Sequence, residues 1–231
     1  MTNTAIVIGA TGLVGASLVD ALKSADHIGK IVTLTRRPIE PSSPKVENKV
    51  VDFDRLTDYS GYFQGSILFS CLGTTVKRAG SIEAQRRVDL EYQYTAAKLA
   101  AEQGVSHYLL VSSSGANAQS ISPYMKMKGE LEERVQSLPF ETICILQPSL
   151  LLGERDHVRV AESLGSKVLP ILCKLPGLRA YRPIYGHQVA EKMVALSRKP
   201  QEAFSRLILD CLLYTSPSPR DLSTSRMPSS A

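Results

Sequence analysis

The chain has 231 residues, of which 43% are hydrophobic and 21% are charged, and these values fit one soluble globular domain with a substantial core. Its formal charge is +5 and the basic residues are spread along the sequence, so we expect no nucleic-acid partner. No apolar run reaches the roughly 18 residues that a membrane-spanning helix needs, so we expect no membrane partner either.

The four cysteines are isolated from one another in the sequence. Cys71, Cys144, Cys173 and Cys211 form no Cys-x-x-Cys pair, and no His stands at a ligand spacing from them. We therefore expect reduced thiols and no metal site. An apolar run over Ala5–Ile8 begins a strand almost at the first residue, so we expect no signal peptide and a cytoplasmic protein.

Seven short segments rich in Ile, Val and Leu are predicted to be strands. They lie at Ala5–Gly9, Lys30–Thr35, Lys49–Asp52, Ser66–Cys71, His107–Ser112, Glu141–Leu146 and Arg206–Leu209. Most of them are continuously apolar rather than alternating. This pattern is typical of a parallel sheet that is buried on both faces.

Helical patterns separate these strands. They cover Leu13–Ser24, Ile82–Gln103, Tyr124–Ser137, Val158–Leu164 and His187–Ser197. Strands that alternate with helices favour right-handed crossovers between parallel strands. The predicted fold class is therefore α/β, a doubly wound parallel sheet of the Rossmann type.

Residues 1–210 are predicted to form this single domain. Within it, residues 151–185 are irregular and rich in proline, and we expect them to form a small C-terminal cap over the carboxyl ends of the strands. From Cys211 the sequence changes to CLLYTSPSPRDLSTSRMPSSA. Two pieces of it, CLLYTSPSPRD and SRMPSSA, match translated sequencing-adapter DNA. We interpret residues 211–231 as adapter read-through and expect them to be disordered.

A glycine-rich segment follows the first predicted strand and opens the first helix. Gly9 allows a tight turn, Gly12 lets the backbone approach a diphosphate, and Gly15 lets helix and strand pack closely. The N-terminus of the helix offers free N–H groups and a partial positive charge to the phosphates. The strand–turn–helix context therefore predicts a dinucleotide site made by Gly9, Ala10, Thr11, Gly12, Leu13, Val14 and Gly15.

Two arginines, Arg36 and Arg37, end the second strand. A site specific for NAD(H) usually places Asp or Glu here, on the ribose hydroxyls. Guanidinium groups instead suit a 2′-phosphate, which they grip with forked, charge-assisted hydrogen bonds. We therefore predict NADP(H) as the cofactor; the alternative is a pair of solvated arginines. Asp52 and Phe53 follow the third strand and are predicted to lie beside the adenine.

A candidate catalytic pair stands at the start of the third predicted helix, Tyr124–Ser137. Tyr124 and Lys128 are four residues apart, so their side chains share a helix face. A nearby ammonium lowers the pKa of a phenol and fits Tyr124 for proton transfer. Hydroxyls at the end of the fifth strand can polarise a carbonyl. Ser113 is the favoured catalytic serine, with Ser114 next, and Ser112 is expected to border the cofactor.

Together these residues resemble the atypical short-chain dehydrogenases, and within them the Tat-interacting-protein branch of oxidoreductase-like proteins. The resemblance rests on GATGLVG, the double arginine, CLGTTVKRAG, RVDLEY, the serine strand end, YMKMKGELE and QPSLLLGER. These pieces span residues 5 to about 160. In that branch the double arginine and the Tyr-x-x-x-Lys pair contact NADPH.

The resemblance implies further cofactor contacts. It places Cys71, Leu72, Gly73 and Thr74 along the cofactor, and Pro148, Leu151 and Arg159 at its nicotinamide end. One departure is Asp89, which stands where many extended relatives have Asn. Beyond Arg159 the match fades, and that is where a substrate would be selected.

The sequence therefore predicts an NADP(H)-dependent oxidoreductase that transfers a hydride to or from a small carbonyl or alcohol substrate. Two alternatives remain open. One is an NADP(H)-sensing regulatory protein without turnover, since the family includes regulators. The other is an epimerase or dehydratase, which uses the same residues. The expected partner is a small-molecule substrate, and the expected state is a monomer or homodimer.

Overall fold

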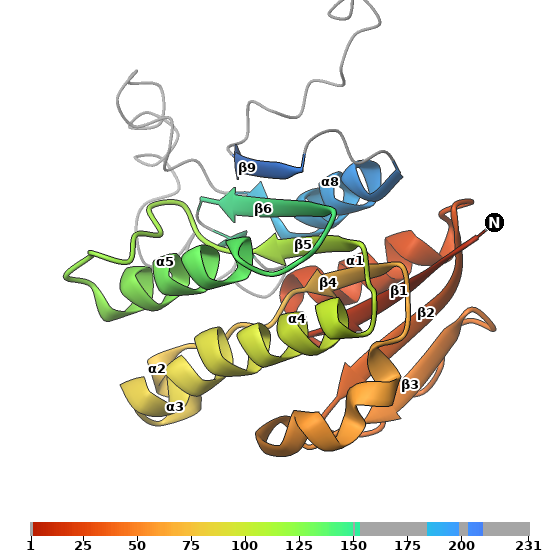
Figure 1. Ribbon diagram of the computed structural model, residues 1–231, viewed down its shortest axis with the longest axis horizontal. Helices are drawn as coiled ribbons and strands as arrows, with labels where there is room; N and C mark the ends of the chain where they lie inside the picture. The colour runs from red at the N-terminus through yellow and green to blue at the C-terminus, as the bar shows by residue number, and fades with distance from the viewer. Residues whose placement is uncertain (1, 150, 153–183, 199–202, 210–231) are drawn as a thin grey trace, which may run out of the picture.

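The computed structural model describes residues 2–149, 151–152, 184–198 and 203–209. In this part of the chain seven parallel strands form one sheet in the order β3-β2-β1-β4-β5-β6-β9 (Figure 1). Their bounds are β1 Asn3–Ile8, β2 Ile28–Thr35, β3 Val46–Val50, β4 Ile67–Ser70, β5 His107–Val111, β6 Thr142–Pro148 and β9 Phe204–Leu209. The doubly wound parallel sheet is confirmed, and its order reverses direction between β1 and β4.

Helices cover both faces of the sheet, with α1 and α8 on one side and α4 and α5 on the other (Figure 1). The α-helices are α1 Leu13–Lys23, α2 Val76–Ala79, α3 Ile82–Arg86, α4 Tyr92–Glu102, α5 Pro123–Gln136 and α8 Gly186–Arg198. A 3-10 helix, η1, spans Phe53–Phe63, and a turn of π-helix, η2, spans Arg87–Glu91.

The central strand β1 shows why the strands read as continuously apolar. Ile6 and Ile8 pack into the core on the α4–α5 side, whereas Ala5 and Val7 pack into the core on the α1–α8 side. All four side chains have an exposed fraction of 0%. Because both faces are covered, neither set of alternate positions can be polar.

The structure divides the long helix predicted at Ile82–Gln103 into α3, η2 and α4. The amide of Tyr92 bonds to the carbonyl of Arg87, five residues back, so the helix is widened by one residue there. Neither η1 nor α2 follows from the sequence pattern. Each follows a residue whose side chain caps it, Asp52 for η1 and Thr75 for α2, and α2 has only four residues.

The predicted third strand began too late, at Lys49 rather than Val46. This strand lies at the edge of the sheet and is mostly polar. Glu47 at its centre pairs with Lys30 at 2.6 Å and with Lys49 at 2.5 Å. Hydrogen bonds and ion pairs to β2 therefore hold an edge strand that has no apolar signature.

The predicted cap at 151–185 lies outside the described residues except at its ends, as do the helix predicted at Val158–Leu164 and the tail at 211–231. The ends of the cap region pair as a short parallel ladder, β7 (Leu151–Leu152) with β8 (Ile184–Tyr185). Among the helices described, none is both long and apolar enough to cross a bilayer.

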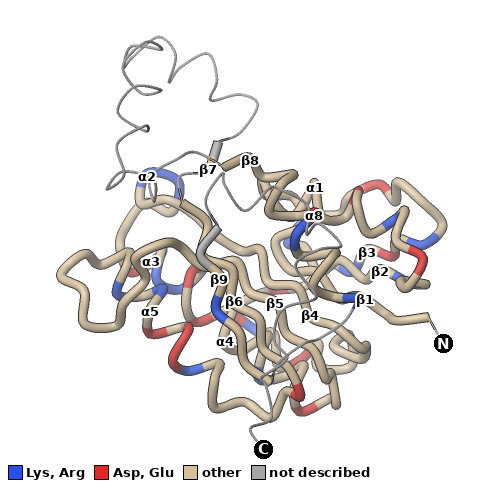
Figure 2. Tube along the Cα trace, turned by 90° about the horizontal axis from the view of Figure 1, so that it is seen from above, with Lys and Arg blue, Asp and Glu red and all other residues tan. Residues whose placement is uncertain are grey.

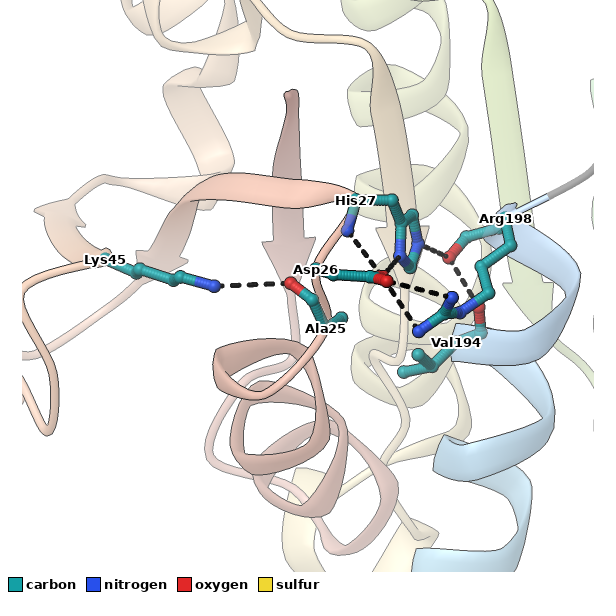
Figure 3. A network of polar contacts seen from close by, with 7 residues as sticks. Ala25, Asp26, His27, Lys45, Val194 and Arg198 are labelled. Carbon is teal, nitrogen blue, oxygen red and sulfur yellow. Dashed lines mark hydrogen bonds and ion pairs between the residues drawn. The ribbon is translucent and has the colours of Figure 1, made fainter. Parts of the chain in front are cut away.

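A polar network fastens the C-terminal end of α8 to the turn between α1 and β2 (Figure 3). The guanidinium of Arg198 pairs with Asp26 at 2.8 Å, and the His27 ring lies 2.9 Å from the Ser197 hydroxyl. Because that hydroxyl donates to the Val194 carbonyl, the ring nitrogen must donate to it. Burial lowers the pKa of His27, so this link uses a neutral ring.

The glycine at position 129 lets α5 lie directly on the preceding loop. A Cβ at Gly129 would stand 2.1 Å from the amide nitrogen of Ala118 and 2.2 Å from the carbonyl carbon of Asn117. The loop is held in turn by a bond of 3.1 Å from the Asn117 amide to the Met125 carbonyl. This contact sets the position of the face of α5 that carries Tyr124 and Lys128.

We predict that Gly129→Ala lowers the free energy of unfolding by about 1–3 kcal/mol, because the added methyl must displace backbone. Helix propensity alone would raise stability by roughly 0.5–1 kcal/mol, so the sign separates the two effects. Urea denaturation measures it. The control is Gly61→Ala in η1, where a Cβ would meet nothing within 4 Å. Equal or higher stability of Gly129→Ala would contradict the close approach.

Candidate functional site

The carboxyl ends of β1 and β4 lie side by side where the strand order reverses. Gly9 leaves β1 with a φ of +80°, and a Cβ there would lie 2.4 Å from the Cys71 carbonyl carbon. A Cβ at Gly15 would lie 2.1 Å from the Gly9 oxygen. Only glycine fits at both positions, so the loop brings α1 directly against the strand ends.

The N-terminus of α1 is open toward this junction. Gly12 is the N-cap residue, and no side chain caps the helix or places an acidic group in its first turn. The first amides of the helix therefore have no capping partner from a side chain. Such an N-terminus attracts anions and can seat a phosphate.

A cavity of about 790 Å³ lies above the junction of β1 and β4. It brings together many residues that the sequence predicts to touch a dinucleotide: Gly9, Ala10, Thr11, Gly12, Arg36, Arg37, Asp52, Phe53, Cys71, Leu72, Gly73 and Thr74. Leu13, Val14 and Gly15 lie in the first turn of α1, below the cavity wall. Of these, the Val14 and Gly15 side-chain positions are buried, so only backbone is available from them.

The cavity wall carries four arginines, of which the sequence analysis singled out Arg36 and Arg37. Both are exposed and form no ion pair with a described residue. The Thr35 hydroxyl donates to the Arg37 carbonyl at 2.7 Å and shapes their turn. The wall also includes Arg78 and Arg87, which sequence reasoning missed. Arg78 belongs to α2, a largely basic helix in Figure 2.

The far end of the cavity is aromatic. Phe53 is buried and packs against Tyr92 with ring centroids 5.6 Å apart. The Tyr92 hydroxyl donates to Asp54 at 2.6 Å, and burial, followed by this carboxylate, raises the pKa of Tyr92. Asp52 accepts a bond of 3.0 Å from the Asp54 amide. The predicted residues Asp52 and Phe53 thus form one corner with Tyr92, which the sequence analysis did not assign to the site.

Tyr124 and Lys128 share one face of α5, as their spacing predicts. The Lys128 Nζ lies 6.0 Å from the centroid of the Tyr124 ring. The ammonium is also paired: it lies 2.9 Å from Asp89 Oδ1, with exposed fractions of 3% for Lys128 and 1% for Asp89. Asp89 Oδ2 accepts the Thr74 amide at 3.0 Å, so the pair adjoins the cavity wall.

Cys71 stands at the same strand junction, directly after β4. Its side chain points into the core on the α1–α8 side, where its sulfur lies 3.9 Å from that of Met193. Burial raises the pKa of this thiol to about 12, and the charge of Lys128 offsets this only in part. The thiol is therefore neutral, and Cys71 offers the cavity backbone and a small apolar surface rather than a nucleophile.

The three serines at the end of β5 differ in their bonding. The Ser112 hydroxyl donates to Glu132 at 2.5 Å and is buried. Ser113 and Ser114 are half-buried, and the Ser114 amide donates to the Pro148 carbonyl at 2.9 Å. Ser112 thus faces α5, and the other two hydroxyls have no described partner.

Tyr124, Lys128 and the three serines are not among the residues that line the cavity, and the remaining predicted contacts lie apart from it as well. Pro148 ends β6 and is buried, and Leu151 in β7 packs against the core on the α1–α8 side. Neither lines the cavity. Arg159 is outside the described residues. In the part of the chain that is described, no group of three His, Cys, Asp or Glu side chains could hold a metal ion.

Glu132 is a buried carboxylate one turn beyond Lys128. Its exposed fraction is 1%, and Arg206 of β9 pairs with it at 3.1 Å. The Gln147 amide donates to both of its oxygens, at 2.8 and 3.0 Å. One side chain of α5 therefore ties together the ends of β5, β6 and β9, beside the serines.

The strand order, the glycine loop and the cavity at the reversal define a Rossmann-type α/β protein. The chain belongs to the NAD dependent epimerase/dehydratase family, whose model matches residues 5–174.

Curated relatives agree with this membership. The chain is 35% identical to "Protein FMP52, mitochondrial" of Eremothecium gossypii over 210 residues, which cover 88% of this chain and 92% of that protein. It is 35% identical to "Protein HTATIP2" of Rattus norvegicus over 172 residues, 72% of this chain and 71% of the relative. The second similarity confirms the resemblance to the Tat-interacting-protein branch.

Solved structures share the fold at low sequence identity. "MoeE5 in complex with UDP-glucuronic acid and NAD" has a TM-score of 0.68 at 16% identity and covers 88% of this chain and 75% of its own. "Putative NAD-dependent epimerase/dehydratase from Bacillus halodurans" has a TM-score of 0.66 at 19% identity, covering 90% and 95%. These likenesses support the fold assignment.

The expectation of a cytoplasmic protein is wrong. Several fungal relatives, among them those of Eremothecium gossypii, Coccidioides immitis and Candida albicans, are named as mitochondrial proteins. The expectation rested on isolated cysteines and on a strand that starts near the first residue. Both features describe the folded domain, and neither carries information about the compartment.

We predict that Glu132→Ala lowers the free energy of unfolding by about 2 kcal/mol, because the buried Ser112 hydroxyl and Gln147 amide both lose their acceptor. The loss at Arg206 adds less, since that side chain is 44% exposed and water can solvate it. Chemical denaturation measures the change. Glu133→Ala, at the neighbouring exposed position, is the control and should stay within about 0.5 kcal/mol of the parent protein. Similar values for the two variants would contradict the role of the network.

Proposed function

We propose that this protein is an NADP(H)-dependent oxidoreductase that transfers a hydride to or from a small carbonyl or alcohol substrate. The observation that supports it most is the cavity, in which the glycine loop and two arginines that pair with no described residue face the same space. A diphosphate suits the open N-terminus of α1. A 2′-phosphate suits Arg36 and Arg37, because no carboxylate stands at the end of β2 to repel it.

The other walls of the cavity fit the rest of a dinucleotide. Phe53 offers an apolar face to an adenine, and the exposed carboxylate of Asp52 can accept a hydrogen bond from its amino group. Leu72 and Gly73 continue from β4 along the opposite side. The small glycine leaves the backbone of this segment accessible to a ribose.

A bound nicotinamide would supply or accept the hydride. Tyr124 would hold the proton at its phenol oxygen and exchange it with the substrate oxygen. Lys128 on the same face would orient the ribose and the phenol. Ser113 or Ser114 would orient the substrate oxygen, since the Ser112 hydroxyl is already committed to Glu132.

One alternative reaction is supported by the family description, which covers epimerases and dehydratases. An epimerase of this kind takes a hydride and returns it, so its cofactor shows no net oxidation or reduction. A regulatory protein would instead bind NADP(H) tightly with no turnover of either kind. The presence of Tyr124 and Lys128 on one helix face favours an enzyme. A small-molecule substrate and a monomeric or homodimeric state belong to this proposal.

We predict that Arg36→Ser with Arg37→Ser weakens NADPH binding by about 2 kcal/mol or more, roughly thirtyfold in Kd. NADH binding should change little, because its ribose carries no phosphate for the arginines to hold. Calorimetric titration with both coenzymes measures the two constants.

The control for this pair is Arg55→Ser with Lys98→Ser, which removes the same charge from exposed positions outside the cavity. This control should leave the dissociation constants of NADPH and NADH unchanged. It therefore separates a direct contact of the arginines with the phosphate from the effect of the protein's overall positive charge. If the double-arginine variant binds NADPH as tightly as the parent protein, the NADP(H) preference is wrong.

We predict that Tyr124→Phe lowers turnover at least about a hundredfold while the NADPH dissociation constant stays nearly unchanged, because it removes the exchangeable proton and keeps the ring. The measurement is NADPH oxidation with a panel of aldehydes, ketones and quinones. Tyr62→Phe, on the exposed side of η1, is the control. Equal turnover in Tyr124→Phe and the parent protein would overturn the assigned role. Tight coenzyme binding by the parent protein with no turnover would favour the regulatory alternative.

A further inference from the structure

The ion pair between Lys128 and Asp89 joins two parts of the site that the proposed function uses separately. Lys128 stands on α5 with the candidate catalytic tyrosine, and Asp89 stands on η2 beside the coenzyme cavity. Their charged atoms lie 2.9 Å apart, and neither side chain is more than 3% exposed. Few charged groups in the described chain are so deeply buried.

Burial makes the lysine dependent on its partner. An ammonium removed from water loses its hydration, and without a counter-charge it gives up its proton well below its usual pKa. Tyr124 on its own helix and Asp89 on η2 adjoin Lys128, and the Cys71 thiol, which points to the α1–α8 side, is still influenced by its charge. Burial raises the pKa of the Cys71 thiol, so this group stays neutral, and Asp89 is the carboxylate among these groups. Asp89 is therefore the group among these that supplies a negative charge.

The structure holds the Asp89 carboxylate firmly in place. One oxygen accepts the Thr74 amide, and the Thr74 carbonyl in turn accepts from the Gln85 side chain at 3.1 Å. The Gln93 amide donates to the Asp89 carbonyl at 2.8 Å, and Gln93 also accepts the Ser70 hydroxyl at 2.8 Å. These bonds connect η2 to the end of β4.

Asp89 lies within the widened helical turn of η2. A π-helical turn inserts one residue and leaves a carbonyl without its usual amide partner. The side chain of Gln93 fills that role for Asp89. Such turns are often found at functional sites, where they redirect a side chain. The Asp89 side chain in this turn contacts both the Thr74 amide of the cavity wall and the lysine of α5.

We propose that Asp89 is a positioning residue of this site: its carboxylate keeps the Lys128 ammonium charged and holds it beside the Thr74 segment of the cavity. Any effect of Asp89 on catalysis depends on the proposed function. The ion pair itself can be tested without coenzyme. Asp89 acts through Lys128 and is not assigned a contact with a reacting atom.

The test is Asp89→Asn, which keeps the shape of the side chain and an oxygen for the Thr74 amide but removes the charge. Lysine ε-carbons are isotopically labelled and followed by NMR through a pH titration of the coenzyme-free protein, with Lys128→Met used to assign the resonance. We expect the Lys128 resonance of Asp89→Asn to titrate roughly two or more pH units lower than that of the parent protein.

The matched control is Glu91→Gln, which makes the same change of charge two residues away. Glu91 pairs with Arg86 and Arg134 at the surface and is not a partner of Lys128. The Lys128 resonance of the Glu91→Gln variant should titrate at the same pH as that of the parent protein. An Asp89→Asn protein whose Lys128 resonance titrates as in the parent overturns the proposal.

A second readout uses the coenzyme. In Asp89→Asn, NADPH affinity should fall on the order of tenfold as pH rises through the lowered Lys128 titration, and it should recover at lower pH. A purely structural defect would weaken binding at every pH. If the parent protein binds no nicotinamide coenzyme, the proposed function fails, but the NMR titration still decides the role of Asp89.

The double variant Asp89→Asn with Lys128→Met covers the case in which Asp89→Asn does not fold. Removing both charges of a buried pair is often tolerated where removing one is not. Folding of the double variant alone would show that an unpaired ammonium caused the defect and would support the proposal. Failure of both variants to fold would overturn it, because the defect would then be independent of the lysine charge.

Discussion

The site depends on the fact that only backbone fits between the carboxyl ends of β1 and β4. Gly9 lies against the carbonyl of Cys71, and Gly15 lies against the oxygen of Gly9. A single methyl group at either place would push α1 away from the sheet. Because this space is closed to side chains, the open end of α1 stands at the strand reversal, and the cavity forms above it.

Much of this arrangement is visible in the sequence because it has local causes. Strands buried on two faces must be apolar throughout, as β1 shows, and the glycine loop must follow the first of them. The carboxyl ends of parallel strands meet at one edge, so residues that follow different strands can be predicted to lie together. Arg36, Asp52 and Gly73 line one cavity for this reason.

Other features have causes that are not local, and the sequence does not reveal them. Arg87 and Tyr92 lie in the RVDLEY segment that carries the family resemblance, yet nothing in its helical pattern assigns either of them to the cavity that both line. Asp89 stood out only as a departure from relatives. Its partner is 39 positions away in sequence on another helix, and only the packing of η2 against α5 brings the two charges together. The three serines of β5 look equivalent in sequence and differ only in which element each hydroxyl faces.

Helix α5 is the element on which these contacts converge. Tyr124, Lys128 and Glu132 follow one another at intervals of four residues, so they form a stripe along one face. The stripe is anchored at two buried points: Lys128 is held by Asp89 on the cavity side, and Glu132 is held by Ser112, Gln147 and Arg206 on the side of the last strands. Both anchors use charges that cannot return to water without loss of several bonds. These two anchors tie α5 to η2 and to the last strands of the sheet, and Tyr124 stands one turn before the first of them. Under the proposed function, two buried ion pairs on α5, one and two turns beyond Tyr124, hold the helix that carries the phenol.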